Sequence, residues 1–322
     1  MPHPIIGIGH SVGASHLTHL SHLHPRLLHS LILIDPIIQQ DIEIHKTLAR
    51  LSTSRRDTWP SRETAAEAFR NSKFYQAWDP RVLEQWIRFG LRDLPTEQYP
   101  DDEVIKPHQG EDANNGPNKS DSCADVPVTL ITTVAQEVYF YVRARYRDKR
   151  LLQEGEEDFP DNIHPAESGL DHGHGAADPQ QQQQNLLSRP ESRELFRLLP
   201  RLKPSVQYIF GAQSPASTPE NRLAKMATTG TGAGGSGGAQ AGCVREVVLD
   251  CGHLVGFEAP AESARASADF VHAELGRWEA RERARDGALE GLGRRERVGI
   301  NERWRESVGV KVKVKLGPQG RL

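Results

Sequence analysis

Gly9-His10-Ser11-Val12-Gly13, a G-x-S-x-G pentapeptide, comes directly after the apolar run Pro4-Ile5-Ile6-Gly7-Ile8. Residues 14–31 read as a helix, and the apolar residues 31–34 read as a buried strand. This order of strand, G-x-S-x-G and helix predicts a sharp turn that lifts the serine hydroxyl out of a sheet. We expect both flanking glycines to be required, because a Cβ at either position would clash. Ser11 is therefore the candidate nucleophile, and the alternative is an ordinary strand-to-helix turn.

The composition indicates a core accompanied by polar, poorly packed segments. The chain has 322 residues, enough for one large α/β domain or two small ones. Hydrophobic residues make up 37% of it and the mean hydropathy is −0.59, both low for a fully packed enzyme of this length. The net charge of −3 gives no reason to expect a nucleic-acid or anionic-membrane partner. No apolar run approaches the roughly 18 residues of a membrane span.

The cysteines and the first residues of the chain indicate in which cellular compartment we expect the protein. Cys123, Cys243 and Cys251 form an odd, sparse set without metal-ligand spacing, which suits a reducing environment. A signal peptide is not recognisable, because the first apolar stretch is short and lacks a basic leader.

Apolar runs and helical periodicity recur along the rest of the chain. Residues 41–100 read as mostly helical, and their aromatic side chains suit core packing or a lid that lines an apolar pocket. Beyond residue 125 we predict strands at 128–133, 205–210 and 244–249, and helices at 134–146, 191–199 and 261–278.

Three polar stretches interrupt this pattern. Residues 101–125 read as a loop, and residues 228–242, rich in Gly, Ser and Ala, as a flexible loop. Residues 153–185 are acidic and end in a glutamine run, so they bury too little surface to offset the entropy of ordering and are predicted to be disordered.

The C-terminal residues are predicted to lie outside the folded domain. Residues 279–297 are densely charged, and residues 308–316 alternate valine with lysine. Neither stretch has an apolar face large enough for a second domain. We therefore expect one domain over residues 1–278, with a lid at about 41–100, and a charged extension over residues 279–322.

A nucleophilic serine needs a base and an orienting acid. We call the G-x-S-x-G turn between strand and helix the elbow. After such a turn the partners of the serine follow along the chain in the order acid, then histidine, and the histidine comes after the last strand. His253 has that place, following the predicted strand 244–249, and its ordinary pKa near 6.5 suits it to accept and return a proton. The alternative is a histidine that merely caps a helix.

Two residues are candidates for the acid. The loop after strand 205–210 is the usual station, yet Glu220 is its first carboxylate. Asp35 directly follows the strand after the elbow helix, and we favour it over Glu220. Against Asp35, an Asp-Pro pair after a strand is also a common turn signal.

The remaining histidines are not expected to bind metal. His10 reads as a packing residue beside the site. The helix after the elbow carries several more, without carboxylates at converging positions: His16, His19, His22 and His24. We therefore expect neither a metal nor a cofactor.

Several motifs together resemble those of fungal α/β-hydrolases, in particular host-selective toxin biosynthesis proteins and peroxisomal lipase-like enzymes. They cover about residues 4–278 and are Gly9-His-Ser-Val-Gly-Ala14, Leu31-Ile-Leu-Ile-Asp-Pro36, Trp59-Pro-Ser-Arg62, Trp78-Asp-Pro-Arg-Val82, Tyr208-Ile-Phe-Gly211 and Gly252-His-Leu-Val-Gly-Phe-Glu258. The resemblance implies a parallel sheet of about four strands with a helical lid. It also implies hydrolysis of an ester, thioester or related carbonyl of a small acyl substrate, without a cofactor.

The chain departs from the family pattern at both ends. In the family the elbow follows five strands, whereas here it starts at residue 9, so the resemblance implies the C-terminal part of the fold with its N-terminal strands missing. The amide of Val12 would then supply one oxyanion-hole donor while the other is lost. We expect a truncated serine hydrolase, and the alternative is an inactive remnant with a binding role or none. Gly320-Arg321-Leu322 matches a peroxisomal signal weakly, which leaves cytoplasm or peroxisome.

Overall fold

The computed structural model describes residues 4–39, 43–100, 126–144, 187–188 and 190–310. The chain divides into two compact units, Met1–Phe270 and Val271–Leu322. The expected loop at 101–125, the expected disorder at 153–185 and most of the valine–lysine alternation lie outside the described residues. No described helix combines the length and the apolar character needed to cross a membrane.

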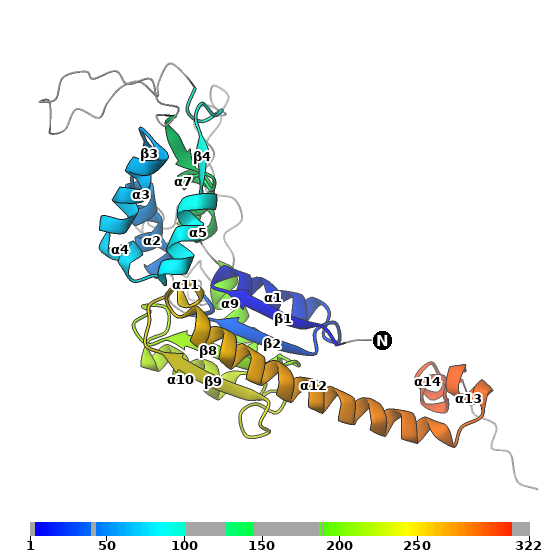
Figure 1. Cartoon of the computed structure of the whole chain (residues 1–322). Helices are drawn as coiled ribbons and strands as arrows, with labels where there is room; N and C mark the ends of the chain where they lie inside the picture. Colours follow the sequence, from blue (N-terminus) through cyan, green and yellow to red (C-terminus); the bar gives the residue numbers. More distant parts are fainter. Residues whose placement is uncertain (1–3, 40–42, 101–125, 145–186, 189, 311–322) are drawn as a thin grey trace, which may run out of the picture. The chain divides into compact units, whose positions relative to one another are not determined.

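A parallel sheet of four strands forms the centre of the first unit, with β1 (Ile6–His10), β2 (Ser30–Ile34), β8 (Ser205–Gly211) and β9 (Val244–Leu249) in the order β1-β2-β8-β9 (Figure 1). Strands of one direction end at the same edge, so the residues that follow β1, β2 and β9 are brought together there. The α/β fold class predicted from the sequence is confirmed.

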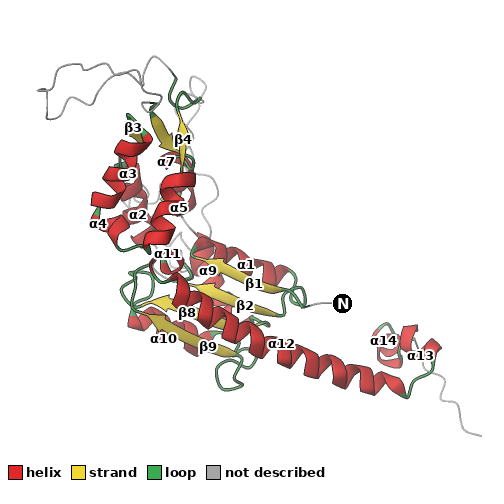
Figure 2. Cartoon of the chain, in the orientation of Figure 1, coloured by secondary structure: helices red, strands yellow, loops and turns green. Residues whose placement is uncertain are grey.

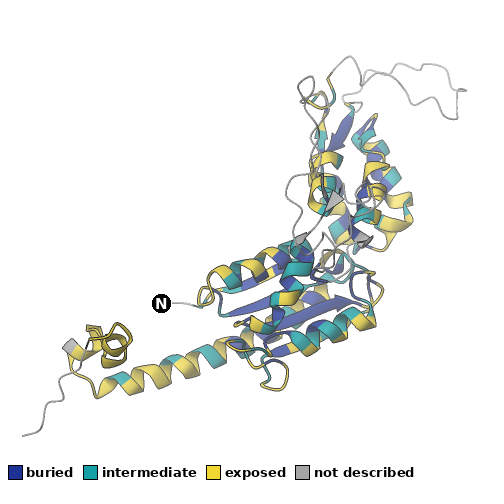
Figure 3. Cartoon of the chain, turned by 180° about the vertical axis from the view of Figure 1, so that it is seen from behind, coloured by how far each residue is buried: buried dark blue, intermediate teal, exposed yellow. Residues whose placement is uncertain are grey.

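The two middle strands read as apolar runs because both of their faces are covered. β2 is buried along four of its five residues and β8 along all seven, which Figure 3 shows as dark blue arrows. One core cluster joins the sheet to the helices around it, and its largest fully buried members include Leu31, Leu33, Tyr208 and Phe210.

Helices connect the strands and cover the sheet (Figure 2). α1 (Val12–Leu23) packs against β1 and β2 and contacts α9 (Pro190–Leu198), which the 3-10 turn η2 (Leu199–Arg201) continues. α10 (Pro219–Thr228), which we did not predict, packs against β9.

The predicted helix over residues 14–31 was too long. α1 ends at Leu23, and Pro25 follows within two residues, where a proline ring and its missing N–H are incompatible with a helix interior. The chain then turns and enters β2 at Ser30, one residue before the predicted strand.

Residues 43–100 and 126–144, which we term the cap, are less helical than predicted. Their helices are α2 (Glu43–Thr53), α3 (Arg62–Asn71), α4 (Lys73–Gln76), α5 (Pro80–Phe89) and α7 (Val134–Tyr141). Between these lies an antiparallel sheet of β3 (Thr58–Trp59), β5 (Val128–Leu130) and β4 (Leu91–Asp93), in that order. β5 forms the first half of the strand predicted at 128–133. β3 and β4 are only two and three residues long and were not predicted, because they lack the alternation that would identify them in the sequence.

The cap has its own apolar core, separate from that of the parallel sheet. Trp59, Phe69 and Trp78 are buried, which confirms core packing for them. Phe74 and Phe89 remain more than half exposed, so core packing was wrong for these two. Trp78 also packs against Phe257, outside the cap, with the two ring centres 4.7 Å apart and the ring planes inclined at 60°.

The loop between α10 and β9 begins at Thr229, later than the predicted residue 228, and is tied to η2. The amides of Gly230 and Gly232 donate to the carbonyls of Leu199 and Pro200 at 2.9 and 2.8 Å. Gly230 has φ of 74°, a backbone conformation that favours glycine.

The last helix of the sheet region continues past its predicted end at residue 278, since α12 runs from Pro260 to Glu290. The part of α12 in the second unit carries ion pairs between residues one helical turn apart, such as Arg283 with Glu279. α13 (Arg294–Val298) and α14 (Glu302–Ser307) follow and are largely exposed.

Lys225 of α10 carries its ammonium group into the core. Its side chain is 0% exposed, and Nζ has no hydrogen-bond partner among the described residues. Nζ lies 5.9 Å from the centre of the Phe210 ring, a weak attraction compared with lost hydration. Burial therefore lowers the pKa of Lys225 from 10.5 to about 8, against a smaller opposite effect of the charge on Asp35.

Replacing Lys225 with methionine should stabilise the protein. The unfolded chain holds the lysine proton more tightly than the folded one, so protonation favours unfolding, and stability is lost as pH falls from 10.5 to about 8. Lys225→Met should remove this dependence and raise the free energy of unfolding at pH 7 by about 3 kcal/mol. Urea titrations at several pH values test this. Lys203→Met, at an exposed lysine, is the matched control. If the free energy of unfolding of Lys225→Met depended on pH as strongly as that of the wild type, the prediction would be contradicted.

Candidate active site

Ser11 occupies a strained turn between β1 and α1. Its φ and ψ are 54° and −120°, and a positive φ is costly for a residue with a Cβ. Its amide donates to the carbonyl of Ile34 at 2.9 Å, which ties the turn to the end of the neighbouring strand β2. The turn predicted from G-x-S-x-G is thus present, and the hydroxyl lies at the sheet edge where the strands end.

The two glycines around Ser11 differ in what they permit. A Cβ on Gly9 would lie 2.7 Å from the carbonyl oxygen of Gly13 and 2.8 Å from the amide of Ala14, both backbone atoms. A Cβ on Gly13 would meet nothing within 4 Å. The expectation that both glycines avoid a clash is therefore right for Gly9 and wrong for Gly13, because Gly13 already lies in the first turn of α1.

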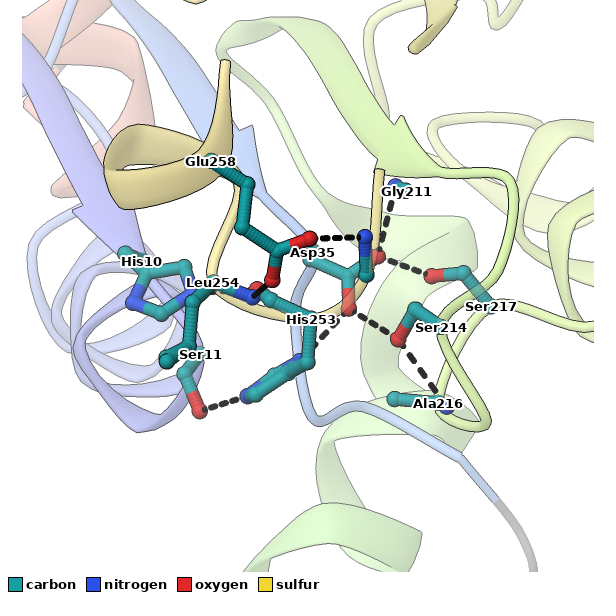
Figure 4. A network of polar contacts seen from close by, with 11 residues as sticks. His10, Ser11, Asp35, Gly211, Ser214, Ala216, Ser217, His253, Leu254 and Glu258 are labelled. Carbon is teal, nitrogen blue, oxygen red and sulfur yellow. Dashed lines mark hydrogen bonds and ion pairs between the residues drawn. The ribbon is translucent and has the colours of Figure 1, made fainter. Parts of the chain in front are cut away.

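His253 lies between Ser11 and Asp35 (Figure 4). Its Nε2 is 2.9 Å from Ser11 Oγ, and its Nδ1 is 2.6 Å from Asp35 Oδ2. Three residues separated by up to 242 positions in the chain are thus connected by two hydrogen bonds. The imidazole is 22% exposed and the carboxylate 0%, so the line of contacts runs from the core toward the surface.

Asp35 reaches this position because it follows the last residue of β2. Its φ is 40°, a second positive value at the same sheet edge, and its amide donates to the carbonyl of Ile209 at 2.8 Å. The backbone is thus held by β8 while the side chain turns toward the histidine loop.

The Asp35 carboxylate is hydrogen-bonded on both oxygens. Oδ1 accepts from the amide of Gly211 at 3.1 Å and from the hydroxyl of Ser217 at 2.5 Å. Oδ2 accepts from the hydroxyl of Ser214 at 2.5 Å as well as from His253. Such a set of donors compensates the loss of water around a buried charge.

These contacts decide the ionisation of Asp35. Burial acts to raise its pKa, but the hydrogen bond and charge of His253, with the hydroxyls of Ser214 and Ser217, hold the pKa below its ordinary 3.8. An ionised carboxylate only accepts, so His253 Nδ1 carries the proton. When the ring carries this one proton, Nε2 is the acceptor that faces the Ser11 hydroxyl.

Glu220, the other candidate acid, lies elsewhere. It is exposed in the first turn of α10, and its pKa is lowered by its own backbone amide and by the hydroxyl of Thr218, the residue that caps this helix. It is Asp35, therefore, whose carboxylate reaches the imidazole.

Val12, the candidate oxyanion-hole residue, is the first residue of α1. Amides in the first turn of a helix have no acceptor four residues earlier within that helix, so they are available to an anion.

Several residues around the site were missed by the sequence analysis. Ser214 and Ser217 lie in the loop after β8, where only a carboxylate was expected to take part. No role was predicted for Glu258, whose carboxylate accepts two backbone amides of the His253 loop. His10, expected to pack beside the site, also bonds the carbonyl of His253 through Nε2.

The other histidines of the elbow helix do not form a recognisable centre. Within the part of the chain that the structure describes, no three His, Cys, Asp or Glu side chains are grouped so that they could hold a metal ion.

No protein-family model matches the chain. Among curated proteins, it is 33% identical over 315 residues to the type I acyl-CoA thioesterase mpaH′ of Penicillium brevicompactum, covering 94% of this chain and 66% of that protein. It is 27% identical over 274 residues to the abhydrolase domain-containing protein AFT2-1 of Alternaria alternata, covering 84% of each. The peroxisomal alpha-beta-hydrolase Lpx1 of Saccharomyces cerevisiae superposes with a TM-score of 0.49 at 16% identity, over 95% of this chain and 60% of that one. The chain spans slightly less than two thirds of the length of the Penicillium relative.

Alanine substitutions at the two glycines of the elbow should have opposite effects. Gly9→Ala forces backbone atoms apart and should lower the free energy of unfolding by roughly 1–3 kcal/mol. Gly13→Ala adds a methyl group in open space on a helix and should raise it by up to about 1 kcal/mol. Denaturant unfolding of both variants checks this, and equal destabilisation would show that the turn is packed differently.

Proposed function

The chain belongs to the α/β-hydrolase superfamily, and on that premise we propose that it is a serine hydrolase that cleaves an ester or thioester through Ser11, His253 and Asp35. The observation that carries the proposal is that one imidazole makes two hydrogen bonds, accepting from a strained serine at 2.9 Å and donating to a buried carboxylate at 2.6 Å. Nucleophile, base and orienting acid need this arrangement and this order of contacts.

In the proposed reaction His253 takes a proton from Ser11 and then gives it to the leaving group. As Ser11 Oγ attacks the carbonyl carbon, its proton passes to Nε2, and the ionised Asp35 stabilises the imidazolium that results. The tetrahedral intermediate then collapses, and the bond to the leaving oxygen or sulfur breaks as Nε2 returns the proton to it. Water repeats the sequence on the acyl-serine and releases the carboxylic acid.

The Val12 amide is the proposed donor to the oxyanion of this intermediate. It immediately follows the nucleophile at the positive end of α1, so it is fixed before the charge develops. One such donor is typically worth about 10² to 10³ in turnover.

For the substrate we propose a small acyl compound, with a thioester as the first class to test. Support comes from the Penicillium relative, which is named as an acyl-CoA thioesterase. The aromatic side chains of the cap pack at steep angles against one another and against Phe257, four residues after His253, so the cap places apolar side chains suited to an acyl chain near the proposed base.

A fluorophosphonate probe should label the protein on Ser11. The probe mimics the carbonyl and reacts only with a serine activated by a base. Labelling should disappear in Ser11→Ala, while hydrolysis of acyl thioesters and p-nitrophenyl esters falls to background. Intact-protein and peptide mass spectrometry locate the adduct. Equal labelling of Ser11→Ala, or none of the wild type, would refute the proposal.

Neutralising the two candidate acids should separate them. Asp35→Asn forces the wrong tautomer on His253 and should lower turnover by about 10⁴-fold. Glu220→Gln, an equal change of charge at an exposed position, should leave turnover within about twofold of the wild type. Steady-state kinetics with unfolding curves measured in parallel test this. A loss of turnover in Glu220→Gln but not in Asp35→Asn would make Glu220 the acid.

A further inference from the structure

The backbone of the loop that carries His253 is fixed by side chains on both flanks of that residue. Asp250 to Leu254 form no helix or strand. Glu258 nevertheless accepts hydrogen bonds from the amides of Gly252 and Leu254, and His10 bonds the carbonyl of His253, so three consecutive residues are held. Figure 4 shows Glu258 and His10 beside His253 and Leu254.

Glu258 holds the loop from the side of α11 (Val255–Glu258). Its Oε2 accepts from the amide of Gly252 at 2.5 Å, and its Oε1 accepts from the amide of Leu254 at 3.2 Å. One carboxylate therefore bridges the residues immediately before and after His253. Hydrogen bonds to a charged acceptor are about twice as strong as neutral ones, so this bridge is stiff.

Gly252 is explained by this bridge. The φ of Gly252 is not positive, so its backbone conformation does not require glycine. A Cβ at this position would instead lie 2.9 and 3.1 Å from the two carboxylate oxygens of Glu258. The Gly-His pair of the sequence thus makes room for Glu258.

His10 holds the same loop from β1. Its Nε2 lies 2.8 Å from the carbonyl oxygen of His253, and the two rings lie 5.0 Å apart. Burial lowers the pKa of His10, so its ring is neutral near pH 7 and carries one proton. A carbonyl only accepts, so this proton is on Nε2, and His10 donates.

We propose that Glu258 and His10 are positioning residues that fix the backbone of His253, so that its imidazole stays aligned between Ser11 and Asp35. The proposal rests on the proposed function, because it concerns the base of that reaction. Ser11 and Asp35 are each tied to strands of the sheet, whereas His253 lies in the loop after β9. Loss of its backbone contacts would let the imidazole shift, and a displacement of about 1 Å costs about 10²-fold in rate.

Graded variants of Glu258 test the bridge. Glu258→Ala removes both contacts and should lower kcat by about 10²-fold, while Glu258→Gln keeps one acceptor and should lose about tenfold, with KM unchanged in both. Glu262→Ala and Glu262→Gln are matched controls, because Glu262 is an exposed carboxylate four residues further on. Gly252→Ala should reproduce the loss of Glu258→Ala.

Two variants of His10 test the second contact. His10→Phe keeps a ring against His253 but removes the donor, and should lower kcat several-fold. His10→Gln restores an N–H donor at a similar distance and should recover most of that rate. Equal rates in the two variants, with melting temperatures equal to that of the wild type, would overturn the role of His10.

A spectroscopic readout separates this proposal from the proposed function. The Nδ1 proton that His253 donates to Asp35 should give a downfield proton resonance, which should broaden in Glu258→Ala and persist in Glu262→Ala. If kcat, the fluorophosphonate labelling rate and this resonance are unchanged in Glu258→Ala, the positioning role is refuted while the proposed function stands. If the wild type is not labelled, the proposed function fails, and the resonance alone decides whether Glu258 and His10 hold the imidazole.

Discussion

A fully buried carboxylate is the constraint on which the candidate site depends. Asp35 is 0% exposed, and an uncompensated charge at such a place would take up a proton or disrupt the fold. Its two oxygens accept from Ser214, Ser217, the amide of Gly211 and His253. The ends of β2, β8 and β9 must therefore stay in register for the charge to persist. The same register brings the imidazole to Ser11, so the stability of this edge and the proposed chemistry have one structural cause.

The residues that the sequence could identify are those whose place follows from a strand end. Ser11, Asp35 and His253 each follow an apolar run, and parallel strands bring such positions to one edge. The partners that complete the site were not predictable in this way. Ser214 and Ser217 lie in the loop after β8 and Glu258 in the short helix α11, and all three take part because of where these segments meet in space, which no periodicity in the sequence reveals.

The same distinction holds for the fold. The apolar runs of the central sheet were sufficient to locate β2, β8 and β9 within about a residue of their observed bounds. In the antiparallel sheet of the cap only β5 was predicted, whereas β3, β4 and their pairing with β5 were not, because the pairing joins residues far apart in the chain. The end of α1 was misplaced because the apolar pattern continued past Pro25, although a proline there ends the helix.

The glycines show that membership of a sequence motif does not determine whether a side chain would fit at the position. Gly9 and Gly13 belong to one pentapeptide, yet only Gly9 is in close backbone contact. Gly252 belongs to a different motif and is restricted by a carboxylate instead of by a turn.

The four-residue helix α11 links the cap to the loop of His253. The Phe257 ring lies 4.7 Å from the Trp78 ring at a steep angle, and the Phe257 carbonyl accepts from the amide of Asp79 at 2.8 Å, so the cap contacts α11 at this residue. The next residue, Glu258, holds the amides on either side of His253. Phe257 thus contacts the apolar surface of the cap, and the next residue, Glu258, holds the loop of the proposed base. A displacement of α11 would therefore alter the contact with the cap and the contact with the histidine loop together.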